Sequence, residues 1–445
     1  MKKTIPFLLF FTLSFLYAET ISLEEVRVLA LANSRSLAQI NMSIRSSELN
    51  EKSHLFTMLP SLDANYNASM DYLNKDWEFV NPIDTFNAGI NMSLTQTIFN
   101  GGKNVIQKAI NEISSESTRK DALAEYFRVL ESADNAYYAV VESLLTLEAA
   151  QLSLESAVSA LAIAEIRQAS GMINLGDYLK AMADREAQEN SRNQARRNLA
   201  LNITKLKSLI KVDNLPDLEQ IDLSFYETLI QYLGNISDGD FENLYNRLWN
   251  LIAASNPTLG KAALRTQSAQ KSLSLAKRDS APTLNATIVS GNFNYSTANG
   301  FDTSSGGKIT LSGNIPIDFW VLSNKIERSK ISLESSYLDY INSESELETT
   351  LQSFLINVIT QAESVLSSRR SLEYAQKHYE YVEERYRLSQ SSVSDLGDAS
   401  SLLISNRNNN IKANFGFLQS LSQIRSLGAI SDDVEFIALL LGIIS

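Results

Sequence analysis

The chain contains no cysteine, two histidines, seven prolines and 17 glycines in 445 residues. The absence of cysteine excludes disulfides, thiol catalysis, iron–sulfur clusters and every cysteine-ligated zinc site. Two isolated histidines, His54 and His378, leave little for histidine-based metal binding or acid–base chemistry. The sequence also contains no nucleophile–base set, phosphate-binding loop or metal-ligating cluster. We therefore predict that the chain is not an enzyme and that it binds no cofactor and no metal.

Basic residues are outnumbered, with 39 Lys and Arg against 51 Asp and Glu and a net charge of −12 at pH 7. No segment is dense in Lys or Arg, and this composition argues against nucleic acid as a partner.

Residues 1–18 are typical of a secretory signal peptide. Lys2 and Lys3 precede an apolar run from Ile5 to Tyr17, and Ala18 is a small residue suited to cleavage. This run is too short to span a bilayer as a helix, and we expect no membrane-spanning helix in the rest of the chain. The protein is therefore predicted to be exported.

The rest of the chain is predicted to be a tandem duplication. Residues 32–37 reappear as 254–259, and residues 59–62 reappear as 281–284, both 222 positions later. Apolar residues spaced by seven also occur twice, 218 positions apart, as Val140, Leu147, Leu154 and Leu161 and again as Val358, Val365, Leu372 and Tyr379.

In the first repeat, apolar residues at helical spacing and the absence of Gly and Pro predict one helix over 21–59, which Pro60 ends. Polar and apolar residues then alternate over 62–72 and again over 86–98. A period of two predicts strands with one wet side and one apolar side, joined as a hairpin over about 62–98.

In the second repeat the same pattern predicts strands over 284–288 and 308–317, within a hairpin over about 284–317. The alternation changes phase near Val289, where we predict a bulge. The connections 73–85 and 292–306 are long, as the outer loops of a membrane barrel are.

Long helices are predicted after each hairpin, because residues 103–170 and 317–396 contain neither Gly nor Pro. A helix of that length reaches roughly 100 Å, which implies packing as a coiled coil. Breaks are predicted at 171–176 and near 389–397, each followed by a returning helix. The predicted parts are a signal peptide over 1–18, a first repeat over 19–212, an irregular linker over 213–240, a second repeat over 241–430 and a C-terminal tail over 431–445.

Four amphipathic strands of bilayer length cannot close a barrel, and an open sheet edge in lipid leaves backbone groups without hydrogen-bond partners. Several chains must therefore contribute strands. About eight strands give an interior filled by side chains, so a pore needs at least three copies. The polar strand faces, rich in Asn, Ser and Thr, would then line water.

The sequence resembles the TolC-like outer-membrane efflux proteins over essentially the whole mature chain. The resemblance depends on both helix breaks, on residues 59–62 (LPSL) and 96–102 (QTIFNGG), and on 315–317 (IPI). It implies an α+β membrane protein, a homotrimer with a 12-stranded transmembrane β-barrel in the outer membrane of a Gram-negative cell. A long α-helical coiled-coil barrel would cross the periplasm.

The resemblance also implies the function of a passive exit duct in a tripartite efflux pump or type I secretion system. Its partners would be a periplasmic adaptor (membrane fusion) protein, an inner-membrane pump and outer-membrane lipid. Drugs, metals and proteins all leave cells through ducts of this architecture. The alternative is a structural periplasmic or surface coiled-coil protein with soluble hairpins.

In this family the periplasmic tip, at the two helix breaks, is the gate. Asp395 and Asp398, in the motif at 395–399 (DLGDA), match the acidic residues whose rings narrow the entrance. Carboxylates brought together by symmetry bind cations and filter charge. The alternative for both residues is helix capping.

Asp177 matches the acidic position of the first break, and Tyr386 matches the tyrosine that such gates link to it. For Tyr386, coiled-coil packing is the alternative. The family's second-half glycine is Ser389 here, and Ser391 stands where some members have arginine, so we expect a different network at the tip.

Overall fold

The computed structural model describes residues 20–73, 77, 79–83, 85–297, 299–304 and 307–442. The chain forms two compact units. Within the described residues, unit 1 comprises 20–37, 124–256 and 347–442, and unit 2 comprises the described parts of 38–123 and 257–346. Each unit therefore contains segments from both halves of the sequence.

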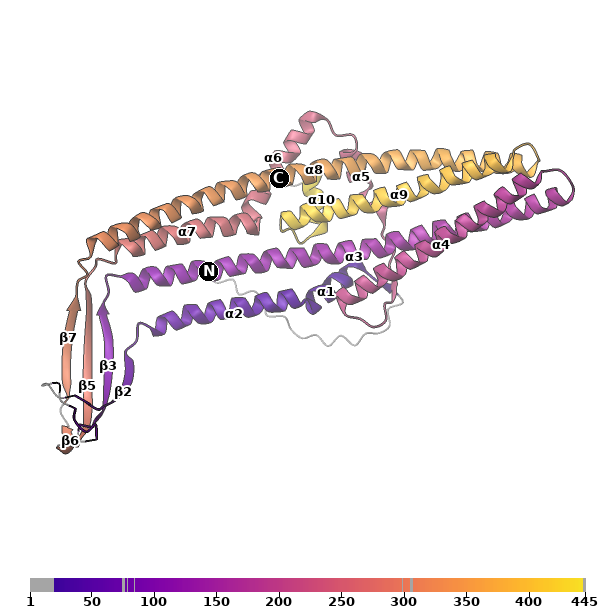
Figure 1. Ribbon diagram of the computed structural model, residues 1–445. Helices are drawn as coiled ribbons and strands as arrows, with labels where there is room; N and C mark the ends of the chain where they lie inside the picture. Colours follow the sequence, from indigo (N-terminus) through magenta and orange to yellow (C-terminus); the bar gives the residue numbers. More distant parts are fainter. Residues whose placement is uncertain are drawn as a thin grey trace. The chain divides into compact units, whose positions relative to one another are not determined.

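Unit 2 contains an antiparallel sheet in which strands of the two halves pair with each other (Figure 1). Its order is β2 (Ser61–Ser69), β3 (Asn87–Phe99), β5 (Thr283–Ser296) and, both on the far side of β5, β6 (Gly300–Ser304) and β7 (Lys308–Asn314). The β3–β5 pair joins the first half of the sequence to the second.

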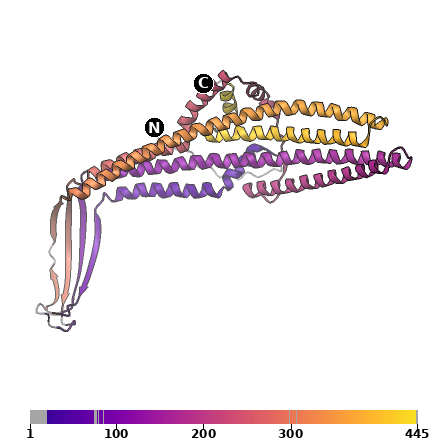
Figure 2. The same cartoon turned by 45° about the horizontal axis from the view of Figure 1, so that its top comes forward.

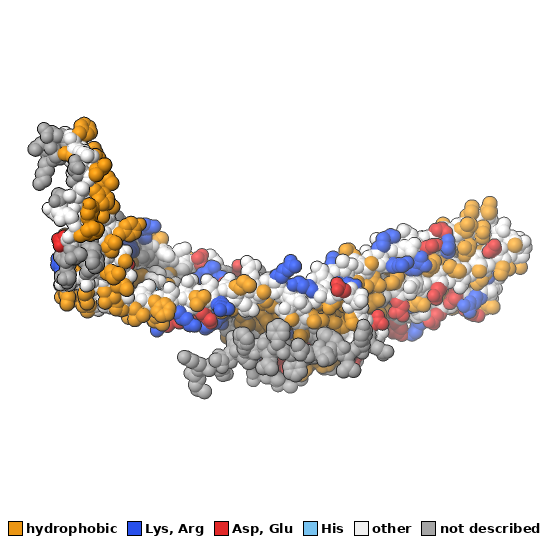
Figure 3. Space-filling view, turned by 90° about the horizontal axis from the view of Figure 1, so that it is seen from below, with side chains coloured by type: hydrophobic (Ala, Val, Ile, Leu, Met, Phe, Trp, Pro, Cys, Tyr) orange, Lys and Arg blue, Asp and Glu red, His pale blue; other side chains and the backbone are white. Residues whose placement is uncertain are grey.

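Residues that pair across this sheet continue the predicted alternation from strand to strand. One row is apolar and consists of Leu62, Leu94, Ile288 and Ile309, all of them exposed. A neighbouring row on the opposite face is polar and consists of Ser61, Thr95, Thr287 and Thr310. Hydrophobic side chains gather along the strands in Figure 3. The prediction of strands with one apolar and one polar side is confirmed.

The strand ends differ from the predicted ones. β2 ends at Ser69 rather than at residue 72. β7 ends at Asn314 rather than at 317, because Pro316 has no N–H to continue the ladder.

The β5 strand is longer than predicted and continues, with β6, into the expected loop 292–306. The predicted bulge is present just after Val289. Met92 pairs with Ser290 but Ile90 pairs with Phe293, so β5 has one extra residue between these pairs.

Four long helices follow the hairpins, as predicted. α3 (Lys103–Ala169) and α8 (Phe319–Arg387) have 67 and 69 residues, and α4 (Leu175–Ile210) and α9 (Val393–Leu427) return beside them (Figures 1 and 2). The α3 helix also contains a stretch long and apolar enough to span a membrane, which the sequence analysis did not expect. Helices that pack against one another in a protein can be as apolar as a membrane-spanning helix. In α3, Ala133 and Val140 are buried within unit 1.

The prediction of one unbroken helix over 21–59 is wrong. α1 (Leu23–Asn33) and α2 (Arg35–Phe56) are separated at Ser34, which has an extended backbone. The Ser34 hydroxyl accepts a hydrogen bond from the N–H of Leu37 at 3.2 Å, so this serine caps α2.

The predicted linker and tail contain more regular structure than expected. The linker contains β4 (Asp217–Leu218), which pairs with β1 (Thr20–Ile21). It also contains the 3₁₀ helix η1 (Leu223–Tyr226), α5 (Glu227–Leu233) and the start of α6 (Asp238–Ser255), which α7 (Pro257–Lys277) follows. The tail contains α10 (Asp433–Leu440). The glycines and proline of this region suggested irregular chain, but Leu229, Ile230 and Leu233 are apolar at helical spacing and are buried.

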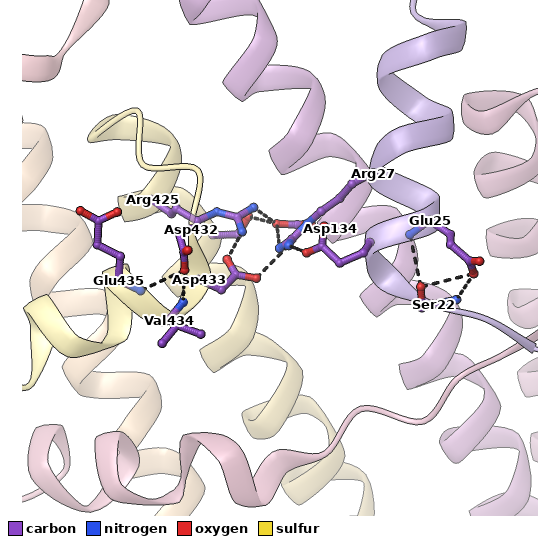
Figure 4. A network of polar contacts seen from close by, with 11 residues as sticks. Ser22, Glu25, Arg27, Asp134, Arg425, Asp432, Asp433, Val434 and Glu435 are labelled. Carbon is purple, nitrogen blue, oxygen red and sulfur yellow. Dashed lines mark hydrogen bonds and ion pairs between the residues drawn. The ribbon is translucent and has the colours of Figure 1, made fainter. Parts of the chain in front are cut away.

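A buried cluster of charges joins four helices of unit 1 (Figure 4). Asp134 of α3 is fully buried and accepts hydrogen bonds from Arg27 Nε at 2.6 Å, from the Ser422 hydroxyl at 2.8 Å and from Arg425. Asp433 of α10 accepts from Arg27 at 2.8 Å and also from Arg425. Two arginines thus face two carboxylates, as buried charges require.

Protonation of Asp433 depends on these arginines. Burial alone would raise the pKa of the Asp433 carboxyl, but Arg425 and Arg27 outweigh burial and lower the pKa below its ordinary value. The ionised Asp433 carboxylate therefore stabilises the folded state. This contribution is fully present above the ordinary carboxyl pKa of about 3.9 and is lost as the pH falls through the lower pKa of the folded state.

We predict that Asp134→Ala lowers the free energy of unfolding by about 3–5 kcal/mol, because it removes the fully buried acceptor of both arginines and leaves them with Asp433 alone. The matched control is Asp433→Ala, since the Asp433 side chain is 30% exposed and water can replace it. Urea unfolding of the detergent-solubilised protein measures both. An Asp134→Ala effect no larger than that of Asp433→Ala would contradict the prediction.

Candidate functional site: the tip of the helical hairpins

The α3 helix ends in a glycine-dependent turn. Gly171 has a φ of 74°, the N–H of Met172 donates to the carbonyl of Arg167 at 2.8 Å, and the N–H of Gly171 donates to Gln168 at 3.0 Å. This pair of hydrogen bonds is the Schellman motif, in which a left-handed residue stops the helix.

The α8 helix ends with the same geometry 218 positions later, but with a serine in place of the glycine. Ser389 has a φ of 60°, the N–H of Gln390 donates to Arg385 at 2.8 Å, and the N–H of Ser389 donates to Tyr386 at 3.0 Å. A residue with a Cβ adopts this conformation at a cost.

Asp395 contributes to the cap of α9, and the capping interpretation is confirmed for this residue. Its N–H donates to the Ser392 hydroxyl at 3.1 Å, and its carboxylate accepts from the N–H of Ser392 at 2.9 Å and from the Ser391 hydroxyl at 3.2 Å. The hydrogen bond from the Ser392 backbone is the main cause that lowers the pKa of Asp395.

Asp398 lies three residues after Asp395 on the same exposed face of α9. The opposite face, with Val393, Leu396 and Ala399, is buried against the neighbouring helices. The structure therefore brings both predicted gate carboxylates to one solvent-facing strip.

The predicted link between Asp177 and Tyr386 is not a hydrogen bond among the described residues, and the hydrogen bonds given for the two residues go to other partners. Tyr386 is 1% exposed and its hydroxyl donates to the carbonyl of Ala160 at 3.4 Å. Asp177 lies in the first turn of α4, where its N–H donates to the Asn174 side chain at 2.9 Å. Burial raises the pKa of the Tyr386 hydroxyl, while Arg167 lowers it and Asp177 raises it further.

Arg167, which is not among the residues predicted above, reaches from the last turn of α3 to the end of α8. Its guanidinium lies 4.3 Å from the centre of the Tyr386 ring, and it donates to the carbonyls of Tyr386 and Arg387, the latter at 3.5 Å. The repeat held a signal for it, since Arg167 and Arg385 stand at equivalent positions, four residues before Gly171 and Ser389.

Comparison with known proteins assigns a family. The sequence pattern of the family described as "Outer membrane efflux protein" matches residues 26–210 and 248–428 of this chain. The chain belongs to the outer membrane efflux protein family. No curated protein sequence matches it significantly.

Solved structures of outer-membrane channels share the fold of this efflux protein. CusC is 14% identical with a TM-score of 0.76, covering 91% of each chain. The CmeC outer membrane channel of Campylobacter jejuni is 17% identical with a TM-score of 0.73, covering 93% of this chain and 88% of its own. The open state of the MtrE channel of Neisseria gonorrhoeae is 15% identical with a TM-score of 0.71, covering 91% and 88%.

The efflux protein is therefore an outer-membrane duct for export. The family consists of channels rather than enzymes. This confirms the interpretation as a channel over the alternative of a structural coiled-coil protein.

We predict that Ser389→Gly stabilises the α8–α9 turn and that Gly171→Ser destabilises the α3–α4 turn. Ser389→Gly should raise the free energy of local opening at the α8–α9 turn by up to about 1 kcal/mol, because glycine adopts the left-handed conformation without strain. Gly171→Ser should lower the same quantity at the α3–α4 turn by about 1 kcal/mol.

Amide hydrogen exchange of the two turns measures both values. A Cβ at Gly171 would meet no atom within 4 Å, so that variant isolates the backbone cost. Equal exchange rates in both variants and the wild type would refute the prediction.

Proposed function

We propose that three copies of this chain form one channel, in which each copy contributes its sheet to a closed 12-stranded barrel. The observation that supports this most is the exposed apolar row of the sheet beside the polar row on the opposite face. In a barrel the apolar row faces lipid and the polar row faces water.

The edges of the sheet support an oligomer. Within the part of the chain that the structure describes, β2 pairs only with β3, and β7 only with β5. Each outer edge therefore presents backbone N–H and C=O groups that need partners in lipid. The β2 edge of one copy and the β7 edge of the next would satisfy each other.

A duplication accounts for the two halves, 19–212 and 241–430. Both halves contain a long helix ended by a left-handed residue, followed by an N-cap side chain that accepts from the N–H three residues on. The family pattern also matches one stretch in each half.

We infer that the tip of the helical part binds a periplasmic adaptor, which connects the duct to an inner-membrane pump. The duct itself is then passive. Around a threefold axis, Asp395 and Asp398 would form two rings of three carboxylates, which would favour cations at the periplasmic entrance. The hydrogen bonds that lower the pKa of Asp395 keep its ring charged at neutral pH.

Crosslinking tests the shared barrel, and the absence of native cysteine makes every disulfide attributable to introduced residues. We predict that Asn65→Cys in β2, combined in turn with cysteine at each position of 308–314 in β7, gives covalent dimers and trimers for at least one pairing. Denaturing gels without reductant show the products. Each single-cysteine variant is the control, and monomers from every pairing would count against the barrel.

The gate prediction concerns charge. The double variant Asp395→Asn with Asp398→Asn should lower the preference for cations and weaken block by multivalent cations, measured in planar lipid bilayers. The matched control removes two acidic charges from the body of α8, by Glu373→Gln with Glu380→Gln, and should leave selectivity unchanged. Unchanged selectivity in the tip variant would reject the proposed gate.

A further inference from the structure

Positive charge gathers where the sheet of unit 2 meets its helices. The charged side chains of the described strands are Asp63, Asp302 and Lys308. The segments 99–106, 276–282 and 315–325, which connect strands to helices, contain four basic residues against two acidic ones. The basic residues are Lys103, Lys277, Arg278 and Lys325, and the acidic ones are Asp279 and Asp318. Four minus two leaves this end of the sheet with an excess of two positive charges.

Three of these cations lie around Asp279, where the ends of α3, α7 and α8 come together. Asp279 forms an ion pair with Lys103, with 3.2 Å between Nζ and Oδ1, and another with Lys325. Arg278 donates to the carbonyl of Gly101 at 2.8 Å, which brings its guanidinium to the start of α3. We call Lys103, Arg278, Asp279 and Lys325 the junction cluster.

One carboxylate does not use all the donors of the junction cluster. A lysine ammonium has three N–H donors and an arginine guanidinium has five, whereas a carboxylate has only two oxygens. Arg278 and Lys325 are exposed and Lys103 is partly exposed, and ion pairs at such sites contribute little to stability. The junction cluster therefore retains donors and positive charge for a second anion.

The junction cluster lies at the depth of the lipid headgroups when the sheet spans the bilayer. Lys103 follows the last residue of β3 by four positions, and Asp279 precedes the first residue of β5 by four. The headgroup layer is about 5–8 Å thick, and lysine side chains extend along apolar surface to reach it. Phe319 and Trp320, in the first turn of α8, are 66% and 69% exposed, and tryptophan is enriched at this depth.

We propose that the junction cluster is a binding site for an anionic phospholipid of the periplasmic leaflet, in which Lys103, Arg278 and Lys325 bind the lipid phosphate. A zwitterionic lipid offers the same phosphate without a net charge, so the positive excess selects an anionic headgroup such as phosphatidylglycerol. All four residues belong to one chain, so each copy has its own site. The depth of the site in the membrane rests on the proposed function.

Titration of the delipidated, full-length protein in detergent tests the site, with native mass spectrometry to count bound ligands. The probes are dioctanoyl phosphatidylglycerol, dioctanoyl phosphatidylcholine and inorganic phosphate. Phosphatidylglycerol should bind at least about fivefold more tightly than phosphatidylcholine, and inorganic phosphate should bind more weakly than either lipid. Equal binding of the two lipids would overturn the selection by charge. Inorganic phosphate that binds as tightly as phosphatidylglycerol would overturn the assignment to a lipid.

Charge variants separate a lipid site from a structural ion pair. Lys325→Gln should weaken the binding of phosphatidylglycerol about fivefold, and its combination with Lys103→Gln about 25-fold. The Lys325 side chain is 58% exposed, so its substitution keeps the fold. Asp279→Asn should instead tighten binding about fivefold, because it adds one positive charge to the site. A cluster that only joins the helices would lose binding in Asp279→Asn as well, and that result would overturn the proposal.

The matched control is Arg196→Gln with Arg197→Gln, which removes two exposed basic charges from α4 and should leave lipid binding unchanged. A loss in this control equal to that of the double lysine variant would overturn the site. The same spectra count the chains in each particle. Trimers that bind no phosphatidylglycerol would overturn the site and leave the proposed channel, whereas single chains that bind it with the expected variant pattern would count against the channel and leave the site.

Discussion

The assembly of this protein depends on backbone hydrogen bonding at the two outer strands of its sheet, β2 and β7. The apolar row from Leu62 to Ile309 is exposed, and lipid is the environment that suits it. Lipid offers no water to the N–H and C=O groups along the outer edges of β2 and β7. In the barrel that we propose, strands of further copies of the chain satisfy these groups.

The long helices also have apolar surface that one chain does not cover. The buried residues of the 69-residue α8 run from Leu347 to Tyr386, whereas Phe319, Trp320 and Ile331 in its first part are exposed. The turns that end α3 and α8 have the same backbone conformation, with left-handed Gly171 in one and left-handed Ser389 in the other. The serine adopts the left-handed conformation at a cost that the glycine does not have, so the two otherwise similar turns differ in backbone strain.

Much of the fold follows from local patterns in the sequence. The period of two in 86–98 predicts β3, and the absence of Gly and Pro predicts α3 and α8. Ser34 shows where local reading fails, because a serine is tolerated in a helix and becomes a cap only when its hydroxyl finds the Leu37 N–H.

The site was less predictable than the fold. The helix break near 389–397 predicts that Asp395 and Asp398 lie near the start of a helix, as they do in α9, but the sequence does not predict the contacts of Arg167 and Tyr386. Those two residues are 219 positions apart, and Asp134 is 107 positions from Arg27 and 291 from Arg425. Contacts at such separations depend on how helices pack in space, and spacing along one sequence does not encode that.

In the channel that we propose, each chain is one third of the assembly. Native mass spectrometry of the protein extracted from outer membranes in detergent measures this number of chains. We expect a complex of three chains, each somewhat lighter than the 49.4 kDa of the full sequence if the predicted signal peptide is removed. A particle with the mass of a single chain, under conditions that retain the fold, would refute the proposed channel.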